Sequence, residues 1–461
     1  MLTRLRFTNF KSWAEADLQL GRVTGLFGTN SSGKTSLIQF LLMLKQTKEA
    51  TDRAISLELN GDYVSLGTYR DVVFAHNESA RVTFSLGFQR DEGEREWVLR
   101  DPDQSRTSGG LVKSDAMELA AAVEVHQGAP RARELRYSIG EAVFSLAPSK
   151  TDDNRFELTQ SGTLGFKFRR TQGRPWQLPG PVKTYAFPDQ ARTYFQNAGF
   201  LADLEAAFEA EMDRIFYLGP LREDPRRDYL WARSRPTDVG RRGEKAIDAI
   251  LAATDAGELR NLRPRARNMP FQEMVAYWLR ELGLIDSFSV EEIKEGSNRW
   301  WALVRTRPGA PQVLLTDVGF GVSQVLPVIT LLYYVPEGAT VILEQPEIHL
   351  HPLAQAGLAD VILAAAERRR VQVIVESHSE HLLLRLQRRI AERAEPDETD
   401  RLHEKVRLYF CDVSGRGSQL TPLDLDLYGN IRNWPDRFMG DAFGETVAAE
   451  RARLHRMRAA E

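Results

Sequence analysis

Residues 28–35 form a glycine- and serine-rich segment that ends in lysine and threonine, Gly28-Thr29-Asn30-Ser31-Ser32-Gly33-Lys34-Thr35. The apolar residues Val23 to Phe27 before it predict a strand, and the residues from Thr35 to Gln46 predict a helix. Between a strand and a helix, glycines let successive backbone N–H groups surround phosphates, a lysine neutralises the outer phosphates, and a threonine hydroxyl reaches Mg²⁺. The segment therefore predicts a nucleoside triphosphate site formed by Gly28, Asn30, Ser31, Ser32, Gly33, Lys34, Thr35 and Ser36.

A second strand must bring an acidic side chain toward Mg²⁺ and a polar side chain toward the attacking water. The apolar residues Thr340 to Leu343 meet this requirement, because Glu344, Gln345 and Glu347 follow them directly. We expect Glu344 to be the carboxylate on the metal side. The next apolar strand ends in Glu376-Ser377-His378-Ser379, which places His378 at a strand end, where it can sense the γ-phosphate.

The elements that position these residues follow from hydrophobic periodicity. Short alternating segments over residues 80–170 predict an antiparallel sheet, and apolar residues at 201–215 and 274–282 recur at helical spacing. A hairpin is predicted around residues 295–298, and the runs 340–343 and 371–375 read as buried strands of a parallel sheet. We expect an α/β protein with an N-terminal lobe (1–100), a β-then-α insertion (101–310), a C-terminal lobe (311–400) and a small C-terminal domain (401–461).

Composition limits the classes of partner. The chain has 461 residues, of which 42% are apolar, and a net charge of −3, so contact with nucleic acid would have to come from local basic patches. The single cysteine, Cys411, excludes an internal disulfide and agrees with a reducing cytoplasm. The start lacks an apolar signal core and the longest nearly apolar run, 325–335, is too short to span a bilayer. We expect a cytoplasmic protein without a membrane partner.

The order of the motifs resembles one group of ATPases. The phosphate loop is followed by a long insertion, by Gly319-Phe320-Gly321-Val322-Ser323-Gln324, by the segment from Glu344 to Pro352, and by Ser377-His378-Ser379. This order is similar to that of ABC-type ATPases of the RecF, SMC and OLD (overcoming-lysogenisation-defect) kind. The resemblance implies an ABC-type (P-loop) ATPase head with a mixed sheet, interrupted by the β-then-α insertion, that binds ATP with Mg²⁺ held by Thr35 and Glu344.

The ending narrows the resemblance. Leu427 to Ile431 and Asn433 to Phe438 look like the C-terminal domain of unknown function in a stand-alone bacterial branch of AAA-family ATPases, whose relatives occur in phage-defence operons. The segment Tyr217 to Arg222 is also typical of that branch.

The resemblance further implies a head-to-head homodimer. ATP on the Lys34 loop of one subunit would meet the signature turn, residues 319–324, of the other. Backbone N–H groups and a serine hydroxyl would then cradle the γ-phosphate from the opposite side, so that the nucleotide holds the subunits together. The residues implied in this role are Gly319, Gly321, Ser323 and Gln324.

The chain departs from the family pattern at residues 344 and 345. Relatives that hydrolyse ATP rapidly usually carry Asp-Glu where this chain has Glu344-Gln345. The amide of a glutamine cannot take a proton from water as a carboxylate can. Either Glu347 acts as the base, or Gln345 orients water without accepting its proton. A third interpretation is that this stretch only shapes the loop. The exchange predicts slow hydrolysis, and therefore a switch instead of a motor.

Three further sets of residues have more than one possible role. His349, His351, His378 and His381 could form a metal site, although the preferred interpretation makes His378 the phosphate sensor and lets the others shape loops. Phe166, Phe168 and Trp176, which lie among basic residues, form the best candidate surface for nucleic acid. Five arginines could either pair with acids of the insertion or reach a phosphate: Arg222, Arg226, Arg227, Arg241 and Arg242.

These residues lead to three hypotheses of function. The first is a nucleotide-gated dimeric ATPase in anti-phage defence that controls a separate effector, such as a nuclease or toxin. The second is a RecF-like ATPase that repairs DNA or binds DNA ends, and the third is a scaffold that holds ATP with little turnover. Only about sixty residues follow the helix that is expected directly after Ser379. These are too few for a nuclease domain of roughly one hundred residues, so we expect any nuclease to be a separate protein.

Overall fold

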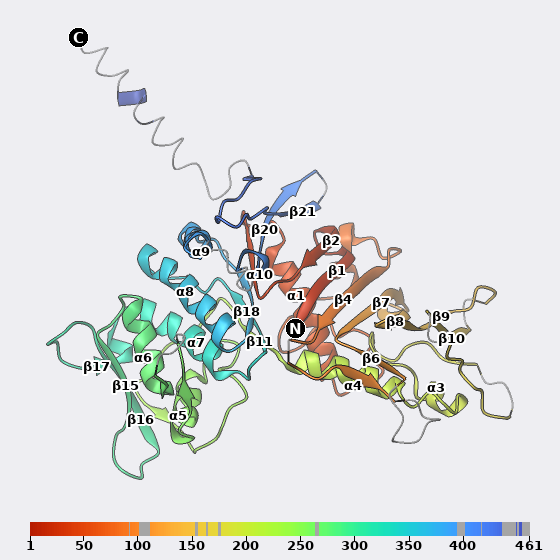
Figure 1. Cartoon of the computed structure of the whole chain (residues 1–461), viewed down its shortest axis with the longest axis horizontal. Helices are drawn as coiled ribbons and strands as arrows, with labels where there is room; N and C mark the ends of the chain where they lie inside the picture. The colour runs from red at the N-terminus through yellow and green to blue at the C-terminus, as the bar shows by residue number, and fades with distance from the viewer. Residues whose placement is uncertain are drawn as a thin grey trace.

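The computed structural model describes residues 1–91, 93–100, 111–152, 155–162, 165–173, 177–262, 267–393, 402–415, 417–435, 449 and 451–453. In Figure 1, an antiparallel sheet and its helices lie on one side of the molecule, and a helix-rich region from α5 to α9 lies on the other. A second sheet, which contains β11, β18 and β20, runs between them.

This central sheet carries the predicted site. Its six strands are ordered β11-β18-β19-β3-β20-β21, and all neighbouring pairs are parallel except β20 and β21. The sheet is therefore mixed, and the predicted parallel pairing of the runs at 340–343 and 371–375 is confirmed as β18 with β19. The strands are β3 (Val23–Gly28), β11 (Ile215–Leu218), β18 (Thr340–Glu344), β19 (Gln372–Glu376), β20 (Val406–Ser414) and β21 (Gly417–Pro422).

Both faces of the central sheet are buried, because successive side chains of each strand enter different cores. On β18, Val341 and Leu343 pack into one hydrophobic cluster and Ile342 packs into the other. The first cluster is covered by α5 (Ala246–Asp255), α6 (Phe271–Glu281), α7 (Phe320–Tyr334), α8 (Pro352–Arg368) and α9 (Glu380–Ala391). The second cluster is covered by α1 (Lys34–Glu49), α4 (Leu201–Asp213) and the antiparallel sheet.

The antiparallel sheet has seven strands in the order β10-β9-β8-β7-β4-β1-β2. The predicted antiparallel sheet over residues 80–170 is confirmed, and it shares its hydrogen bonding with the N-terminal strands β1 and β2. Its strands are β1 (Leu2–Phe10), β2 (Trp13–Gln19), β4 (Val82–Gln89), β7 (Ala116–His126), β8 (Ala129–Ile139), β9 (Ala142–Pro148) and β10 (Phe156–Ser161).

The helical periodicity over residues 201–215 holds as far as α4, but Ile215 lies in a strand instead. The chain leaves the helix at Arg214, and Ile215 pairs with Thr340 at the start of β18. The predicted hairpin at residues 295–298 joins β15 (Ser287–Glu292) to β16 (Arg299–Arg305).

Shorter elements complete the fold, namely α2 (Tyr69–Val72), α3 (Asp189–Tyr194), α10 (Leu402–Lys405), β5 (Trp97–Leu99), β6 (Val112–Ser114), β12 (Tyr229–Leu230), β13 (Leu259–Arg260), β14 (Met269–Pro270) and β17 (Val313–Leu314). None of the helices in the described part of the chain combines the length and apolar character needed to cross a bilayer.

Candidate functional site

The loop between β3 and α1 has the backbone shape of a phosphate cradle. Gly28 and Gly33 have φ values of 142° and 91°, which glycine adopts readily and other residues do not. A Cβ on Gly33 would lie 2.5 Å from the Ser418 hydroxyl, so the loop also requires a glycine for close packing. The buried Lys34 ammonium donates to the Gly28 and Thr29 carbonyl oxygens at 3.1 and 2.7 Å, which holds the cation inside the loop.

Two carboxylates meet at the edge of the sheet that carries this loop. Glu344 and Glu376 are register partners at the ends of the parallel strands β18 and β19. The Thr35 hydroxyl donates to both Glu376 carboxylate oxygens, each at 3.0 Å. Sequence reasoning gave Glu376 no role, although an acid that ends an apolar strand beside the phosphate loop was a usable signal. The carboxylate in contact with the predicted metal ligand Thr35 is therefore Glu376, with Glu344 one strand further along.

Glu344 is buried, with 6% of its surface exposed, and accepts a hydrogen bond from the Tyr217 hydroxyl at 3.1 Å. Burial, and next the neighbouring Glu376 charge, raise the pKa of Glu344 to about 7, against the opposing effects of the Tyr217 hydrogen bond and the Arg222 charge. Burial also raises the pKa of Glu376, against the opposing effects of Thr35 and Lys34. Two buried carboxylates beside each other repel when both are ionised, so a cation between them would be stabilised.

The loop after β18 is strained and linked to the loop after β19. Gln345 has a φ of 44°, which is uncommon for a non-glycine residue, and its backbone N–H donates to the Glu376 carbonyl at 2.8 Å. Glu347 Oε1 accepts hydrogen bonds from the Ser377 hydroxyl at 2.8 Å and from the His378 backbone N–H at 2.7 Å. Among the described residues its other oxygen, Oε2, is buried without a hydrogen-bond partner. Burial raises the pKa of Glu347, which suits a carboxyl group that exchanges protons.

His378 is exposed at the end of β19, beside the phosphate loop. Partial burial lowers the pKa of its imidazole, as does the charge of Lys34, whereas hydrogen bonding to the Gly28 backbone raises it. Ser379 ends this loop by accepting a hydrogen bond from the Leu382 N–H at the start of α9. His378 thus lies between the phosphate loop and α9.

The signature turn forms the start of α7. Gly319 is the N-cap residue, and the Ser323 hydroxyl donates to the Phe320 carbonyl at 2.9 Å within the first turn. Gly319 and Phe320 are exposed, and the Phe320 ring lies 6.1 Å from the His349 ring between centroids. The turn therefore packs beside the loop after β18 and presents its glycine to the outside.

The four histidines have separate surroundings. The side chain of His351 accepts the hydrogen bond of the Leu353 N–H and so caps α8, and His349 lies in the turn before it. Within the described parts of the chain, no three histidine, cysteine or acidic side chains come together to hold a metal ion by themselves. Thr35, Glu344 and Glu376 instead offer oxygen atoms, the donors that Mg²⁺ prefers, and leave room for phosphate oxygens to complete its coordination.

Two of the aromatic residues proposed to stack on nucleic acid, Phe166 and Phe168, are half-buried. The rings of Phe166 and Phe168 each pack against Phe144 and Phe200, with centroid distances from 4.8 to 6.3 Å within this group. Both residues also line a cavity, so the nucleic-acid surface stays a prediction, and Trp176 lies outside the described residues.

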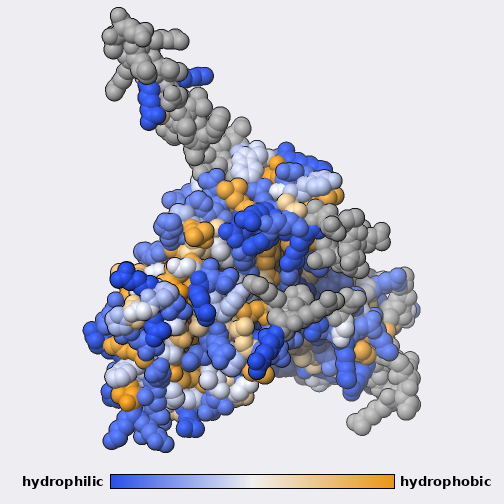
Figure 2. Space-filling view, turned by 60° about the vertical axis from the view of Figure 1, so that its left-hand side comes forward, coloured by the Kyte–Doolittle hydropathy of each residue, from blue (hydrophilic) through white to orange (hydrophobic). Residues whose placement is uncertain are grey.

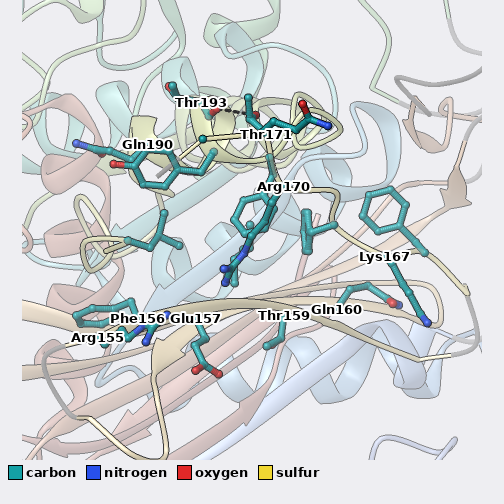
Figure 3. A pocket seen from close by; sticks show the side chains of 18 residues that line it. Arg155, Phe156, Glu157, Thr159, Gln160, Lys167, Arg170, Thr171, Gln190 and Thr193 are labelled. Carbon is teal, nitrogen blue, oxygen red and sulfur yellow. Dashed lines mark hydrogen bonds between the residues drawn. The ribbon is translucent and has the colours of Figure 1, made fainter. Parts of the chain in front are cut away.

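A cavity of about 1150 Å³ opens beside these rings, between β10 and residues 166–173. Figure 3 shows Arg170 reaching into it from above, with Glu157, on β10, and Arg155, just before that strand, below it. It is formed by the far strand of the antiparallel sheet and is separate from the Lys34 loop.

The arginines of α9 are largely neutralised by acidic side chains within the chain. Arg385 and Arg389 both pair with Asp360, at 2.8 and 2.6 Å, and Arg388 pairs with Glu392 at 2.7 Å. On the face shown in Figure 2, hydrophilic residues cover most of the surface, and hydrophobic residues lie in small groups among them. This pairing leaves little free positive charge on α9 for a polyanion.

Two family models match parts of the chain. Residues 197–385 match the family model described as "AAA domain, putative AbiEii toxin, Type IV TA system", and residues 402–448 match "Protein of unknown function (DUF3696)". No curated protein matches the chain.

Among solved structures, the chain is similar to the SMC head domain from Thermotoga maritima, with 11% identity, a TM-score of 0.41 and coverage of 92% of this chain and 99% of that one. It is also similar to the Smc head domain with an extended coiled coil bound to the C-terminal domain of ScpA from Pyrococcus furiosus, with 9% identity, a TM-score of 0.45 and coverage of 92% and 96%. Residues 197–385 are thus similar to an AAA domain, and in the structure they share the central sheet with the strand β3 that leads into the phosphate loop.

Proposed function

We propose that the protein is an ATP-dependent switch whose two copies close on Mg·ATP and control a separate effector. One observation carries the proposal: Thr35 contacts Glu376 where the carboxyl ends of β3, β18 and β19 meet, next to the cradled Lys34. A lysine, a hydroxyl and two carboxylates in that place suit a nucleotide with its divalent cation. When bound, Mg²⁺ would neutralise the phosphates, with Thr35, Glu344 and Glu376 as the residues that hold it or its waters.

Exposed apolar side chains support the dimer. Leu221, Phe320 and Leu353 are 74%, 65% and 67% exposed, and each lies in a loop or helix start that follows the carboxyl edge of the central sheet or in the signature turn beside it. Large exposed apolar side chains near a binding site favour burial against another molecule. A second copy would cover them while its residues Gly319, Gly321, Ser323 and Gln324 reach the nucleotide.

Slow hydrolysis follows from the groups around the expected position of the water. Gln345 can orient water but cannot accept its proton, whereas Glu347 Oε2 is buried with no partner among the described residues and could take the proton. Because Glu347 also joins Ser377 and His378, protonation at this point would be felt by the loop that follows β19.

The biological setting that we propose is bacterial anti-phage defence in the cytoplasm. The matched family model names a toxin of a toxin–antitoxin system, which supports a role in defence. We assign residues 1–100 and 311–400 to the ATPase head, 101–310 to an insertion, and 401–461 to a small domain that, with the insertion, could contact a nuclease, a toxin or DNA.

Mixing two inactive variants tests the shared site. Lys34→Ala should lose nucleotide binding, and Ser323→Arg should block the signature turn for the other subunit. In an equimolar mixture half of the dimers are mixed, and each mixed dimer has one intact site, so ATP hydrolysis should return to about a quarter of the wild-type rate. ATP-dependent dimerisation, measured by light scattering, gives a second readout that does not need turnover. Wild-type hydrolysis by the Ser323→Arg variant alone as a monomer would contradict the proposal.

A further inference from the structure

Four of the five arginines that follow β11 separate into two groups, and the fifth, Arg241, is exposed. Arg226 and Arg242 both pair with Glu223, at 3.4 and 3.6 Å, and Arg227 pairs with Asp317 at 3.2 Å. These three are more than half exposed, so their pairs are ordinary surface contacts of small energy. Of the two predicted roles, pairing with acidic side chains or reaching a phosphate, these three arginines have the first.

Arg222 is different from these three. Only 7% of its surface is exposed, and in the described part of the chain its Nε and Nη1 atoms are buried with no hydrogen-bond partner. Its segment follows β11, the neighbour of β18, and the carboxylates whose charges act on it are those of Glu344 and Glu347. No ion pair joins Arg222 to either glutamate among the described residues, although the charges are within electrostatic range.

A buried guanidinium without partners is costly, because it has lost its water without gaining hydrogen bonds. Burial accordingly lowers the pKa of Arg222 to about 10, although the neighbouring acids act in the opposite direction. The same region holds the unpartnered Oε2 of Glu347. An unused donor and an unused acceptor in one region suit a ligand or water with acceptor and donor atoms.

We propose that Arg222 binds the terminal phosphate of the nucleotide held by the Lys34 loop of the same chain and so distinguishes a triphosphate from a diphosphate. This inference rests on the nucleotide site proposed above. A guanidinium matches phosphate oxygens with two parallel N–H groups, and it stays charged at neutral pH even when buried. Glu347 Oε2 then remains free for water next to that phosphate.

A second buried arginine provides a matched control. Arg369 is largely buried, and burial lowers its pKa to about 10. Its Nε, like two nitrogens of Arg222, is buried without a hydrogen-bond partner among the described residues, but its Nη2 donates to the Val335 carbonyl at 2.6 Å and its Nη1 lies 3.7 Å from Glu337. It lies before β19, at the opposite end of the sheet from the Lys34 loop. Arg369 therefore has partners for its terminal nitrogens within the chain.

The test compares the affinities of the variants for ATP and ADP with Mg²⁺, measured by displacement of a fluorescent nucleotide. Arg222→Gln should weaken ATP at least about tenfold and ADP by less than about twofold, since only ATP has the contacted phosphate. Arg222→Lys should recover part of the loss, because it restores the charge without the paired N–H groups. Arg369→Gln should keep the wild-type ratio of the two affinities.

Thermal unfolding without nucleotide separates binding from folding. Arg222→Gln should unfold at the wild-type temperature or above it, because the variant removes an unpartnered buried charge. A lower unfolding temperature together with an unchanged ATP to ADP ratio would show that Arg222 is structural and overturn the inference.

Nucleotide binding by the Lys34→Ala variant shows whether the nucleotide site itself or only the role of Arg222 is wrong. If Lys34→Ala binds both nucleotides as the wild type does, the nucleotide site itself is misplaced. If Lys34→Ala loses both nucleotides while Arg222→Gln keeps the wild-type ratio, only the role of Arg222 is wrong.

Discussion

The two large sheets of this protein are built in opposite ways. In the antiparallel sheet, β7, β8, β9 and β10 follow one another in sequence and pair as successive neighbours. In the central sheet, β3 lies between β19 and β20, which are more than three hundred residues later in the chain. The local sheet can form from adjacent segments, whereas the central sheet needs distant ones.

The candidate site lies at the edge of the sheet built from distant segments. Parallel strands end at a common edge, so the loops after β3, β18 and β19 bring Lys34, Glu344 and Glu376 together. Antiparallel strands end alternately at opposite edges and cannot gather side chains in this way. The loops of the central sheet therefore lie side by side, and each limits the conformation of the next. In the antiparallel sheet, the conformation of each connection depends mainly on its own turn.

Two glycine substitutions test this difference with the largest expected effect on stability. Gly28→Ala should lower the free energy of unfolding by more than about 2 kcal/mol, because its φ is 142° and a Cβ would lie 2.0 Å from the Cys411 carbonyl oxygen. Gly128→Ala, in the turn between β7 and β8, should cost about 1 kcal/mol, since its φ is 79° but no atom lies within 4 Å of the added Cβ. Denaturant unfolding of both variants gives the two values, and equal costs would contradict the comparison.

The next largest effect is expected for Glu376, the carboxylate in contact with Thr35. Glu376→Gln should lower the affinity for ATP in the presence of Mg²⁺ about tenfold and leave the affinity without Mg²⁺ nearly unchanged, because a neutral amide still meets Thr35 but attracts the cation less. Glu157→Gln, on β10 of the antiparallel sheet, is the control and should change neither value. A Mg²⁺-independent loss would show that Glu376 only supports the loop.

A smaller effect depends on pH. Because the pKa of Glu344 is raised from 4.5 to about 7, the folded protein binds more protons than the unfolded chain between these values, so Glu344 lowers the stability of the nucleotide-free protein as the pH rises through this window. Glu344→Gln should therefore become more stable relative to the wild type from pH 4.5 to about 7, with a constant difference above it. Urea unfolding of both proteins across this range measures the difference, and a difference independent of pH would contradict it.

The smallest effect concerns Cys411, which is buried on β20 beside Gly28. Burial raises the pKa of its thiol to about 12, so the reactive thiolate is scarce near neutral pH. We expect iodoacetamide at pH 8 to leave the folded protein unmodified and to label the unfolded chain once, as measured by mass spectrometry. Rapid labelling of the folded protein would show that the edge between β3 and β20 opens.

Sequence reasoning predicted the parts of the fold in which local pattern decides. The alternation over residues 80–170, the hairpin near Gly296 and the buried strands before Glu344 and Glu376 all have a local hydrophobic period. The position of Ile215 was wrong because a helical period cannot show where a chain turns to pair with a distant strand.

In the site, the loop of Lys34 was visible because its glycine spacing is itself local. Glu376 was given no role and Arg222 was left with two, since their surroundings depend on which strands become neighbours: β19 beside β3, and β11 beside β18. For the same reason the sequence does not show that Phe144 and Phe200 pack against Phe166 and Phe168.

The pairing of β3 with β20 also has a consequence for biosynthesis. Gly28 is the register partner of Cys411, so the strand that leads into the Lys34 loop is enclosed on one side by a strand that is translated much later. A ribosome must therefore synthesise β20 before this loop can take its final shape. During synthesis the antiparallel sheet can fold early, whereas β3 gains this neighbour only when β20 has emerged.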